Sequence, residues 1–200
     1  MSNTNEKTQL YGELLEALEL IETCSAFARI LPEVRTNLVY APAHAITPNE
    51  VAGIDGRITV LNGKPYAVGK PRLGASSHMA RLILEFMKVD PSIRAGVNFV
   101  STPVLEQWLK RYCEQKGWRY STIDRSKEPK KVIEKEGASM PWKIKEAIRA
   151  AHGEVPKVFN EVGAVGKEDL FVLDGNNHIE VATEACEIDQ AYAQSQNTAL

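Results

Sequence analysis

The chain has 200 residues, of which 44% are hydrophobic and 25% are charged, and its formal net charge is −2. These values are typical of an ordinary soluble globular protein, with one domain or one domain carrying a helical extension. They give no sign of a nucleic-acid surface, and no run of about 18 apolar residues indicates a membrane-spanning helix. The N-terminus lacks the apolar core of a signal peptide, and the three cysteines lie far apart without CxxC spacing. We therefore expect a cytoplasmic protein with reduced thiols, and neither nucleic acid nor membrane as a partner.

The first part of the chain predicts one long helix followed by strands. Leu10, Leu14 and Leu18 recur at helical spacing among glutamates, which indicates an amphipathic helix over residues 6–30 that Pro32 ends. A single acidic helix does not make a DNA-reading helix-turn-helix, which needs two short helices and basic residues. Further elements are expected as strands at 37–41, 57–61 and 65–69, a short helix at 47–53, and a two-residue hairpin turn at Asn62-Gly63.

The rest of the chain alternates helices with strands. Helices are expected at 76–88, at 102–117, from Ser139 and from Asn177, and strands at 95–100, 118–123, 155–160 and 169–173. The charged segment 124–136 predicts a loop and then a short exposed helix. Because one hairpin is antiparallel, the pattern favours a layered α/β domain with a mixed sheet. We divide the chain into an N-terminal helix (1–30) packed on the domain, the domain itself (31–186) and a frayed tail (187–200).

Residues 69–88 carry the strongest indication of chemistry. The chain breaks at Gly69 and Gly74, and Ser76 and Ser77 then begin a strongly periodic helix. Such a helix start directs free backbone N–H groups and a positive dipole end at an anion. The two hydroxyls, together with His78 and Arg81 of the same segment, predict a site for phosphate or pyrophosphate. Simpler roles stay open: an N-cap for the serines, a packed histidine, and an ion pair of Arg81 with Glu85.

A second glycine-rich segment, Gly163-Ala164-Val165-Gly166-Lys167-Glu168, allows two interpretations. It is not a nucleotide-binding P-loop, because its spacing is two residues short and Glu168 replaces the required hydroxyl. A simpler phosphate pocket and a tight turn between strands both stay open. By themselves, Arg57 and Arg125 are ordinary arginines. The histidines lack metal-ligand pairing, so a histidine-built metal site has little support.

Taken together, several segments resemble the ThiN family of thiamine-phosphate synthase domains. They are PEV…NLVYA (32–41), GRI (56–58), GASSHMAR (74–81), DPSIRAGVNF (90–99), DRSKEP (124–129), EGASMPW (136–142) and GAVGKED (163–169). The resemblance implies a three-layer α/β/α fold with a mixed, largely antiparallel sheet, akin to class II aldolases (AraD-like). It also implies that hydroxymethylpyrimidine diphosphate and hydroxyethylthiazole phosphate are joined to give thiamine phosphate and pyrophosphate.

The resemblance further assigns roles to residues. It implies that Arg57 and His78 are catalytic, with Mg²⁺ bridging phosphate oxygens of small phosphorylated substrates. Substrate and phosphate binding is expected from Gly74, Ser76, Ser77, Arg81, Asn98, Arg125, Gly163, Gly166 and Lys167. Two positions depart from the family pattern: Asn160-Glu161 stands ahead of the second glycine loop, and Lys143 follows Trp142 where glycine is common.

Alternatives to this enzyme remain. A non-catalytic sensor of thiamine phosphates predicts loss of the arginine or of the short helix before it, usually with an attached DNA-binding head, whereas this chain looks like the stand-alone form. An aldolase-like enzyme on the same fold would need clustered histidine ligands, which the sequence does not offer. A homodimer is left open.

Overall fold

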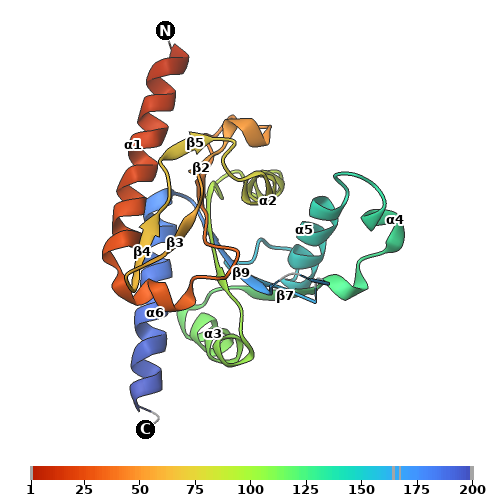
Figure 1. The fold of residues 1–200 in the computed structure, drawn as a ribbon. Helices are drawn as coiled ribbons and strands as arrows, with labels where there is room; N and C mark the ends of the chain where they lie inside the picture. Colours follow the sequence, from red (N-terminus) through yellow and green to blue (C-terminus); the bar gives the residue numbers. More distant parts are fainter. Residues whose placement is uncertain (1, 164, 167, 199–200) are drawn as a thin grey trace.

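The fold is built on one seven-stranded mixed sheet (Figure 1). The computed structural model describes residues 2–163, 165–166 and 168–198. The strands lie in the order β5-β2-β1-β6-β9-β8-β7, and all neighbours are antiparallel except the parallel pair β7–β8. Their bounds are β1 Leu38–Tyr40, β2 Ala52–Ile54, β5 Pro71–Leu73, β6 Ala95–Val100, β7 Tyr120–Asp124, β8 Val158–Val162 and β9 Leu170–Gly175. The predicted mixed, largely antiparallel sheet is confirmed.

A separate two-stranded hairpin consists of β3 (Ile58–Leu61) and β4 (Lys64–Ala67). Its turn residues Asn62 and Gly63 have φ angles of 52° and 74°, the left-handed conformation that two-residue hairpin turns need. The predicted turn is therefore confirmed.

Helices cover both faces of the large sheet (Figure 1). One face carries α1 (Ser2–Thr23), the 3₁₀ turn η1 (Ser25–Ile30), α3 (Pro103–Lys116) and α6 (His178–Thr198). The opposite face carries α2 (Ser77–Met87) and α5 (Ser139–Ala150). The remaining elements are η2 (Pro48–Glu50), η3 (Arg125–Lys127) and the short α4 (Lys130–Ile133). This is the expected three-layer α/β/α arrangement.

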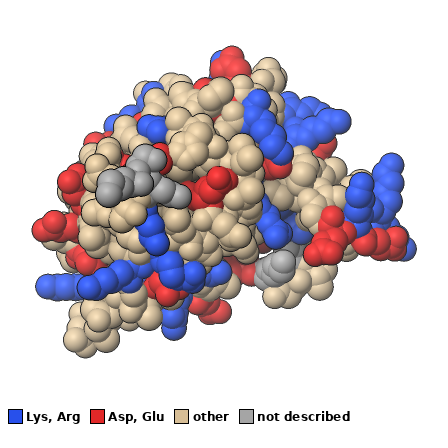
Figure 2. Space-filling model, turned by 90° about the horizontal axis from the view of Figure 1, so that it is seen from above, with Lys and Arg blue, Asp and Glu red and all other residues tan. Residues whose placement is uncertain are grey.

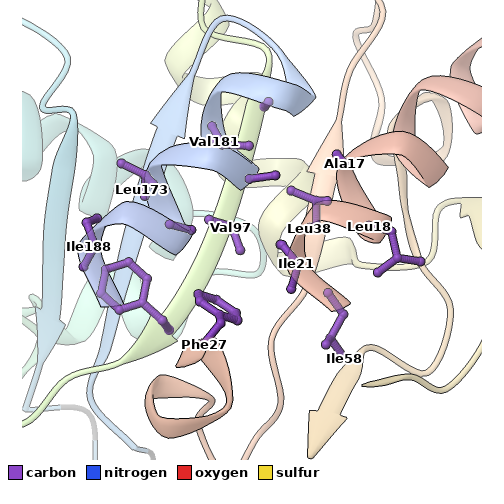
Figure 3. Close-up of a cluster of buried hydrophobic side chains, with 14 of the residues drawn as sticks. Ala17, Leu18, Ile21, Phe27, Leu38, Ile58, Val97, Leu173, Val181 and Ile188 are labelled. Atoms are coloured by element: carbon purple, nitrogen blue, oxygen red, sulfur yellow. The ribbon is translucent and has the colours of Figure 1, made fainter. Parts of the chain in front are cut away.

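Alternation along the strands builds a core on each face. In β9, Phe171 and Leu173 point into the core under α1 and α6, whereas Val172 belongs to the core under α2 and α5. Val97 in the central strand β6 lies opposite Leu38 on one side and Leu173 on the other. Figure 3 shows Leu38, Val97 and Leu173 beside side chains of α1, η1 and α6. The sheet is thus the platform against which α2 packs.

Several expectations need correction. The helix predicted over 6–30 stops at Thr23, and a 3₁₀ turn follows Cys24. Strands β2 and β5 were not expected, because three residues are too few to display a period. The short helix expected at 47–53 is only a 3₁₀ turn, although Thr47 and Glu50 do form a capping box.

The end of the chain also differs from expectation. The segment from 187 is helical through Thr198 instead of frayed. Ile188 and Asp189 are fully buried, and the Tyr192 ring lies 5.2 Å from the Trp108 ring, so packing stabilises this part of α6. Among the described residues, no helix is both long and apolar enough to cross a membrane.

Candidate functional site

Two cavities meet at the N-terminus of α2. The first has a volume of about 210 Å³ and is lined by Arg57, Ser76, His78, Asn98 and Glu161, with apolar Val34, Met79, Leu170 and Val172 and with Asn37 and Glu168. The second has a volume of about 230 Å³ and is lined by Ser77, His78, Arg81, Arg125, Gly137, Ser139, Met140 and Lys143. His78 lines both cavities. The two predicted catalytic residues, Arg57 and His78, both line the first cavity.

Arg57 lies in the loop between β2 and β3 and has an unusual backbone. Its φ angle is 67°, a left-handed conformation that a residue with a long side chain adopts at a cost. The main chain is held there by the bond from Arg57 N to Ile54 O (3.1 Å) and by Val68 N donating to Arg57 O (3.0 Å). Its guanidinium donates to the Val34 carbonyl at the wall of the first cavity. The surrounding structure therefore fixes both the backbone and the side chain of Arg57.

The start of α2 matches the prediction from the sequence. Ser76 is the N-cap residue and is 6% exposed, and its side chain makes no capping hydrogen bond. The first backbone N–H groups of a helix have no acceptor within the helix. Met79, Ile83 and Phe86 anchor the opposite side of α2 in the core, so its N-terminus is held firmly at the cavities.

A buried ion cluster supports His78 from the sheet. Glu161 in β8 accepts hydrogen bonds from Lys143 Nζ at 2.9 Å to each carboxylate oxygen, and one from Arg125. The His78 Nε2 atom lies 3.8 Å from Glu161 Oε2. Burial by itself would raise the pKa of Glu161, but the charges of Lys143, His78 and Arg125 outweigh it and lower that pKa. Glu161 therefore stays ionised, and it holds the cations of Lys143 and Arg125 close to His78.

Arg125 extends this cluster toward α5. Its Nε donates to Glu128 Oε2 at 2.8 Å, and Glu128 in turn accepts a hydrogen bond from Ser139 at the start of α5. Glu128 is 6% exposed. Burial of Arg125 acts to lower its pKa, but Glu128 and Glu161 raise it by more. The cluster thus ties η3, α5 and β8 to one side of the second cavity.

The second cavity has the character of an anion site. Ser77 and Ser139 are the first residues of α2 and α5, so two positive helix ends meet there. Arg81, one turn into α2, adds a cation. Glu85, its proposed partner, is bonded instead to Lys88 at 2.6 Å. Among the described residues Arg81 has no carboxylate partner, which leaves its charge available to a ligand.

Not every predicted residue lines these cavities. Gly74 has a φ of 69° and packs against Asn49, and it shapes the approach to α2 without lining either cavity. Asn98 lines the first cavity, but its amide is already bonded to Asn37 N (2.8 Å) and Arg35 O (3.2 Å). Through these two bonds Asn98 holds residues 35–37 in place at the cavity wall.

The second glycine-rich loop has the tight turn that is one of its two interpretations from the sequence. Gly163 donates to Asp169 at 3.0 Å, and a Cβ there would approach Asp124 Oδ1 to 2.8 Å, which indicates a tight turn. Neither Gly163 nor Gly166 lines the two cavities, and Lys167 lies outside the described residues. Glu168 of the same loop does line the first cavity, where its Oε2 accepts Val34 N at 3.2 Å.

The residues that sequence reasoning missed are mainly Glu161, Lys143 and Asn37. Asn37 bridges β1 and β2 by accepting Ile54 N and donating to Ile54 O, both at 3.1 Å. Lys143 is 2% exposed, which is unusual for a lysine. For Lys143 and Glu161 the sequence offers one signal, a charged residue with apolar residues close by. Both residues stand out in the sequence only as departures from the family pattern.

Figure 2 shows one face of the molecule, on which basic and acidic side chains are interspersed. Within the described part of the chain, no group of three or more His, Cys, Asp or Glu residues is placed to hold a metal ion.

Comparison with known proteins gives consistent matches along most of the chain. A family model described as thiamine-phosphate synthase ThiN matches residues 13–187. The chain is 38% identical over 176 residues to thiamine-phosphate synthase ThiN of Methanothermobacter thermautotrophicus, covering 88% of this chain and 90% of that protein. It is 32% identical over 164 residues to the bifunctional thiamine biosynthesis protein ThiDN of Methanocaldococcus jannaschii, covering 82% of this chain and 37% of that protein.

A solved structure gives the same answer for the fold. The crystal structure of the C-terminal domain of phosphomethylpyrimidine kinase matches with a TM-score of 0.84 and 33% identity, covering 91% of this chain and 99% of that one. The expected likeness to class II aldolases stays a prediction. From the sequence match over residues 13–187 and from the shared fold, we conclude that this chain belongs to the ThiN family.

Proposed function

We propose that this chain is a transferase, a thiamine-phosphate synthase. It joins hydroxymethylpyrimidine diphosphate to hydroxyethylthiazole phosphate and releases pyrophosphate. The observation that carries the proposal is the position of His78, which lines both an apolar cavity with amide groups and a cation-rich cavity. A substrate with an aromatic ring at one end and a diphosphate at the other requires this pair of environments. The 38% identity to a thiamine-phosphate synthase over 88% of the chain supports the same reaction.

The second cavity suits the diphosphate. Phosphate groups favour helix N-termini and arginine side chains, because both present N–H donors to several oxygens. Ser77, Ser139 and Arg81 provide two helix starts and a guanidinium without a carboxylate partner among the described residues. This arrangement supports binding of the diphosphate there before reaction and of the pyrophosphate after it.

The first cavity suits the rings. Its apolar side chains Met79, Leu170 and Val172 provide apolar surface against which an aromatic heterocycle can pack. Arg57 contributes a positive charge at its wall, which would attract the phosphate of the thiazole substrate. Because its backbone and side chain are both held, Arg57 can orient a substrate without first losing conformational freedom.

The reaction needs positioning more than a protein nucleophile. The C–O bond between the pyrimidine methylene and the diphosphate breaks, and both bonding electrons leave with pyrophosphate. The thiazole nitrogen then gives its lone pair to the methylene carbon and forms the new C–N bond. Arg81 and the two helix starts stabilise the negative charge that develops on the leaving group. A protonated His78, at the junction of the cavities, would donate to the departing oxygen.

Mg²⁺ is part of this proposal, in a form limited by the residues present. Mg²⁺ commonly binds one or two carboxylates together with substrate phosphates and water. Glu168 is the carboxylate of the first cavity that has no Lys or Arg partner among the described residues, whereas Glu161 is neutralised by Lys143 and Arg125. Glu168 therefore fits as a protein ligand to an ion held chiefly by phosphate oxygens. When bound, the ion would neutralise charge on the phosphate oxygens of a substrate that reaches the first cavity.

The same proposal covers compartment and partners. We infer an enzyme of the cytoplasm that acts on small phosphorylated molecules instead of nucleic acid. The three cysteines, Cys24, Cys113 and Cys186, are free thiols, which is consistent with a reducing compartment.

A direct assay tests the function. Purified protein is given both substrates with Mg²⁺, and thiamine phosphate and pyrophosphate are measured together. We expect both products in equal amounts, and their loss in Arg57→Ala and in His78→Ala with folding unchanged by circular dichroism. Arg149→Ala and His44→Ala are matched controls, since both side chains are exposed and line neither of the two cavities. Tight binding of thiamine phosphate without release of pyrophosphate would establish a sensor and refute the synthase.

A further inference from the structure

Two of the three thiols come together on the face of the sheet opposite the cavities. Cys24 follows the end of α1, and Cys186 lies in the middle of α6. The Leu20 carbonyl accepts Cys24 N at 3.1 Å and lies 3.8 Å from Cys186 Sγ. Gln190, one turn after Cys186 on α6, places its Nε2 atom 4.0 Å from Cys24 Sγ. Both thiols therefore lie where the end of α1 meets α6, and the Cys186 side chain interacts with that of Cys24.

We propose that Cys24 and Cys186 form an oxidation site, at which an intramolecular disulfide links the end of α1 to α6. The oxidant is a small disulfide such as oxidised glutathione. One cysteine thiolate attacks a glutathione sulfur and releases one glutathione thiolate, and the other cysteine then attacks the mixed disulfide and releases the second. The two cysteines lose two protons and two electrons in total, and the glutathione disulfide gains the electrons.

A cavity gives the oxidant access to this pair. It has a volume of about 280 Å³, and Cys24, Cys186 and Gln190 are among the residues that line it. Cys113 has no such access, because it is fully buried and burial raises its pKa to about 12. The third thiol is therefore an internal control, since it should remain unreactive while the protein is folded.

The surroundings also set the pH dependence of the reaction. Burial raises the pKa of Cys186, and the hydrogen bond with the Cys24 thiol raises it further. Other groups that face the pair are Glu187 on α6, which lines the same cavity, and Asp189, whose charge also raises that pKa. Because the thiolate is the attacking form, the disulfide should form slowly near neutral pH and faster as the pH rises.

The linkage should make the fold more stable. The disulfide would close most of the chain into one loop and connect its first helix to its last. Such a long loop removes much of the freedom of the unfolded chain, so we expect the midpoint of thermal unfolding to rise by about 5 °C or more. The cavities containing Arg57 and His78 lie on the other face of the sheet, so this inference is independent of the proposed function.

Oxidation followed by peptide mapping tests the proposal. The full reduced chain is incubated with oxidised glutathione at pH 8, trapped with N-ethylmaleimide, and digested without reductant for mass spectrometry. We expect one crosslinked peptide pair that joins Cys24 to Cys186, that disappears with dithiothreitol, and that also forms in Cys113→Ala. In Cys186→Ser the link is absent and Cys24 reacts with the maleimide or retains one glutathione.

Three results would overturn the inference. The first is a folded wild-type protein in which both cysteines stay reduced, or each retains its own glutathione. The second is a link that involves Cys113. The third is a Cys24–Cys186 link that forms only after urea unfolding, because this would show that the folded geometry does not bring the sulfur atoms together.

Discussion

Replacing Glu161 by glutamine tests the buried ion cluster beside His78. The substitution keeps the size and shape of the side chain and removes its negative charge. Lys143, which is 2% exposed and bonded to both carboxylate oxygens, then loses the negative charge of Glu161 beside it. Arg125 is affected less, because Glu128 still accepts from it at 2.8 Å. The loss should therefore be dominated by Lys143.

The size of the effect follows from the burial of that lysine. Removing one member of a buried ion pair commonly costs about 3–5 kcal/mol of the free energy of unfolding. We expect about 3 kcal/mol for Glu161→Gln, because the glutamine oxygen can still accept one hydrogen bond from Lys143. In a protein of this length, this corresponds to a midpoint of thermal unfolding that is lower by about 6–12 °C. Activity should fall as well, since His78 loses the carboxylate 3.8 Å away.

Urea unfolding at several pH values, together with a double mutant, provides the assay. Lys143→Met combined with Glu161→Gln also removes the buried amine of Lys143, so the double mutant should recover much of the lost stability but not the activity. Since the pKa of Glu161 is lowered in the fold, its stabilising effect is present above the pKa of the unfolded chain and is lost as the pH falls through the folded pKa. The difference between wild type and Glu161→Gln should therefore narrow on acidification. A loss below about 1 kcal/mol, or no recovery in the double mutant, would refute this account of the cluster.

Three further outcomes are expected. Arg57→Gly should abolish synthesis of thiamine phosphate. The free energy of unfolding should stay unchanged or rise by up to about 1 kcal/mol, since glycine adopts a φ of 67° without strain. A large loss of stability would contradict this. Arg81→Met should raise the KM for the pyrimidine diphosphate by about 10- to 100-fold, whereas Lys88→Met, at the C-cap of the same helix, should not. Steady-state kinetics measures both, and equal effects would show that Arg81 does not bind the diphosphate. Asp174→Asn should stabilise the protein relative to wild type, and increasingly so as the pH rises above about 4. Burial raises the pKa of Asp174 in the folded protein, so this carboxyl ionises at a lower pH in the unfolded chain than in the folded one. Urea midpoints of both proteins at pH 4 and pH 8 check this, and a pH-independent difference would contradict it.

Much of the fold could be predicted because its signals are local. The helix start at Ser76, the N-cap at Thr102 and the turn at Asn62-Gly63 each depend on a few adjacent residues, and the structure has all three. Strands β2 and β5 depend instead on neighbouring strands across the sheet, since three residues form no period of their own. The same holds for the end of α6, where burial against other elements outweighs a polar sequence.

The site shows the same division. His78 and Arg81 could be assigned to one place because they share a helix turn, and Arg57 joined them through the family resemblance. The pair of Lys143 and Glu161 could not be predicted, because it joins α5 to β8 and neither residue alone indicates a partner. The left-handed backbone of Arg57 could not be predicted from its neighbours in sequence either, because hydrogen bonds of the β2–β3 loop impose it.

That the two cavities have a single residue in common also matters for redesign of the enzyme. Substitutions at Leu170 or Val172 would change the shape of the first cavity without altering Ser77 or Arg81 in the second cavity. A library confined to the apolar wall could therefore search for acceptance of unnatural heterocycles while diphosphate binding is kept constant. Thiamine analogues carrying altered rings are the compounds such variants would make.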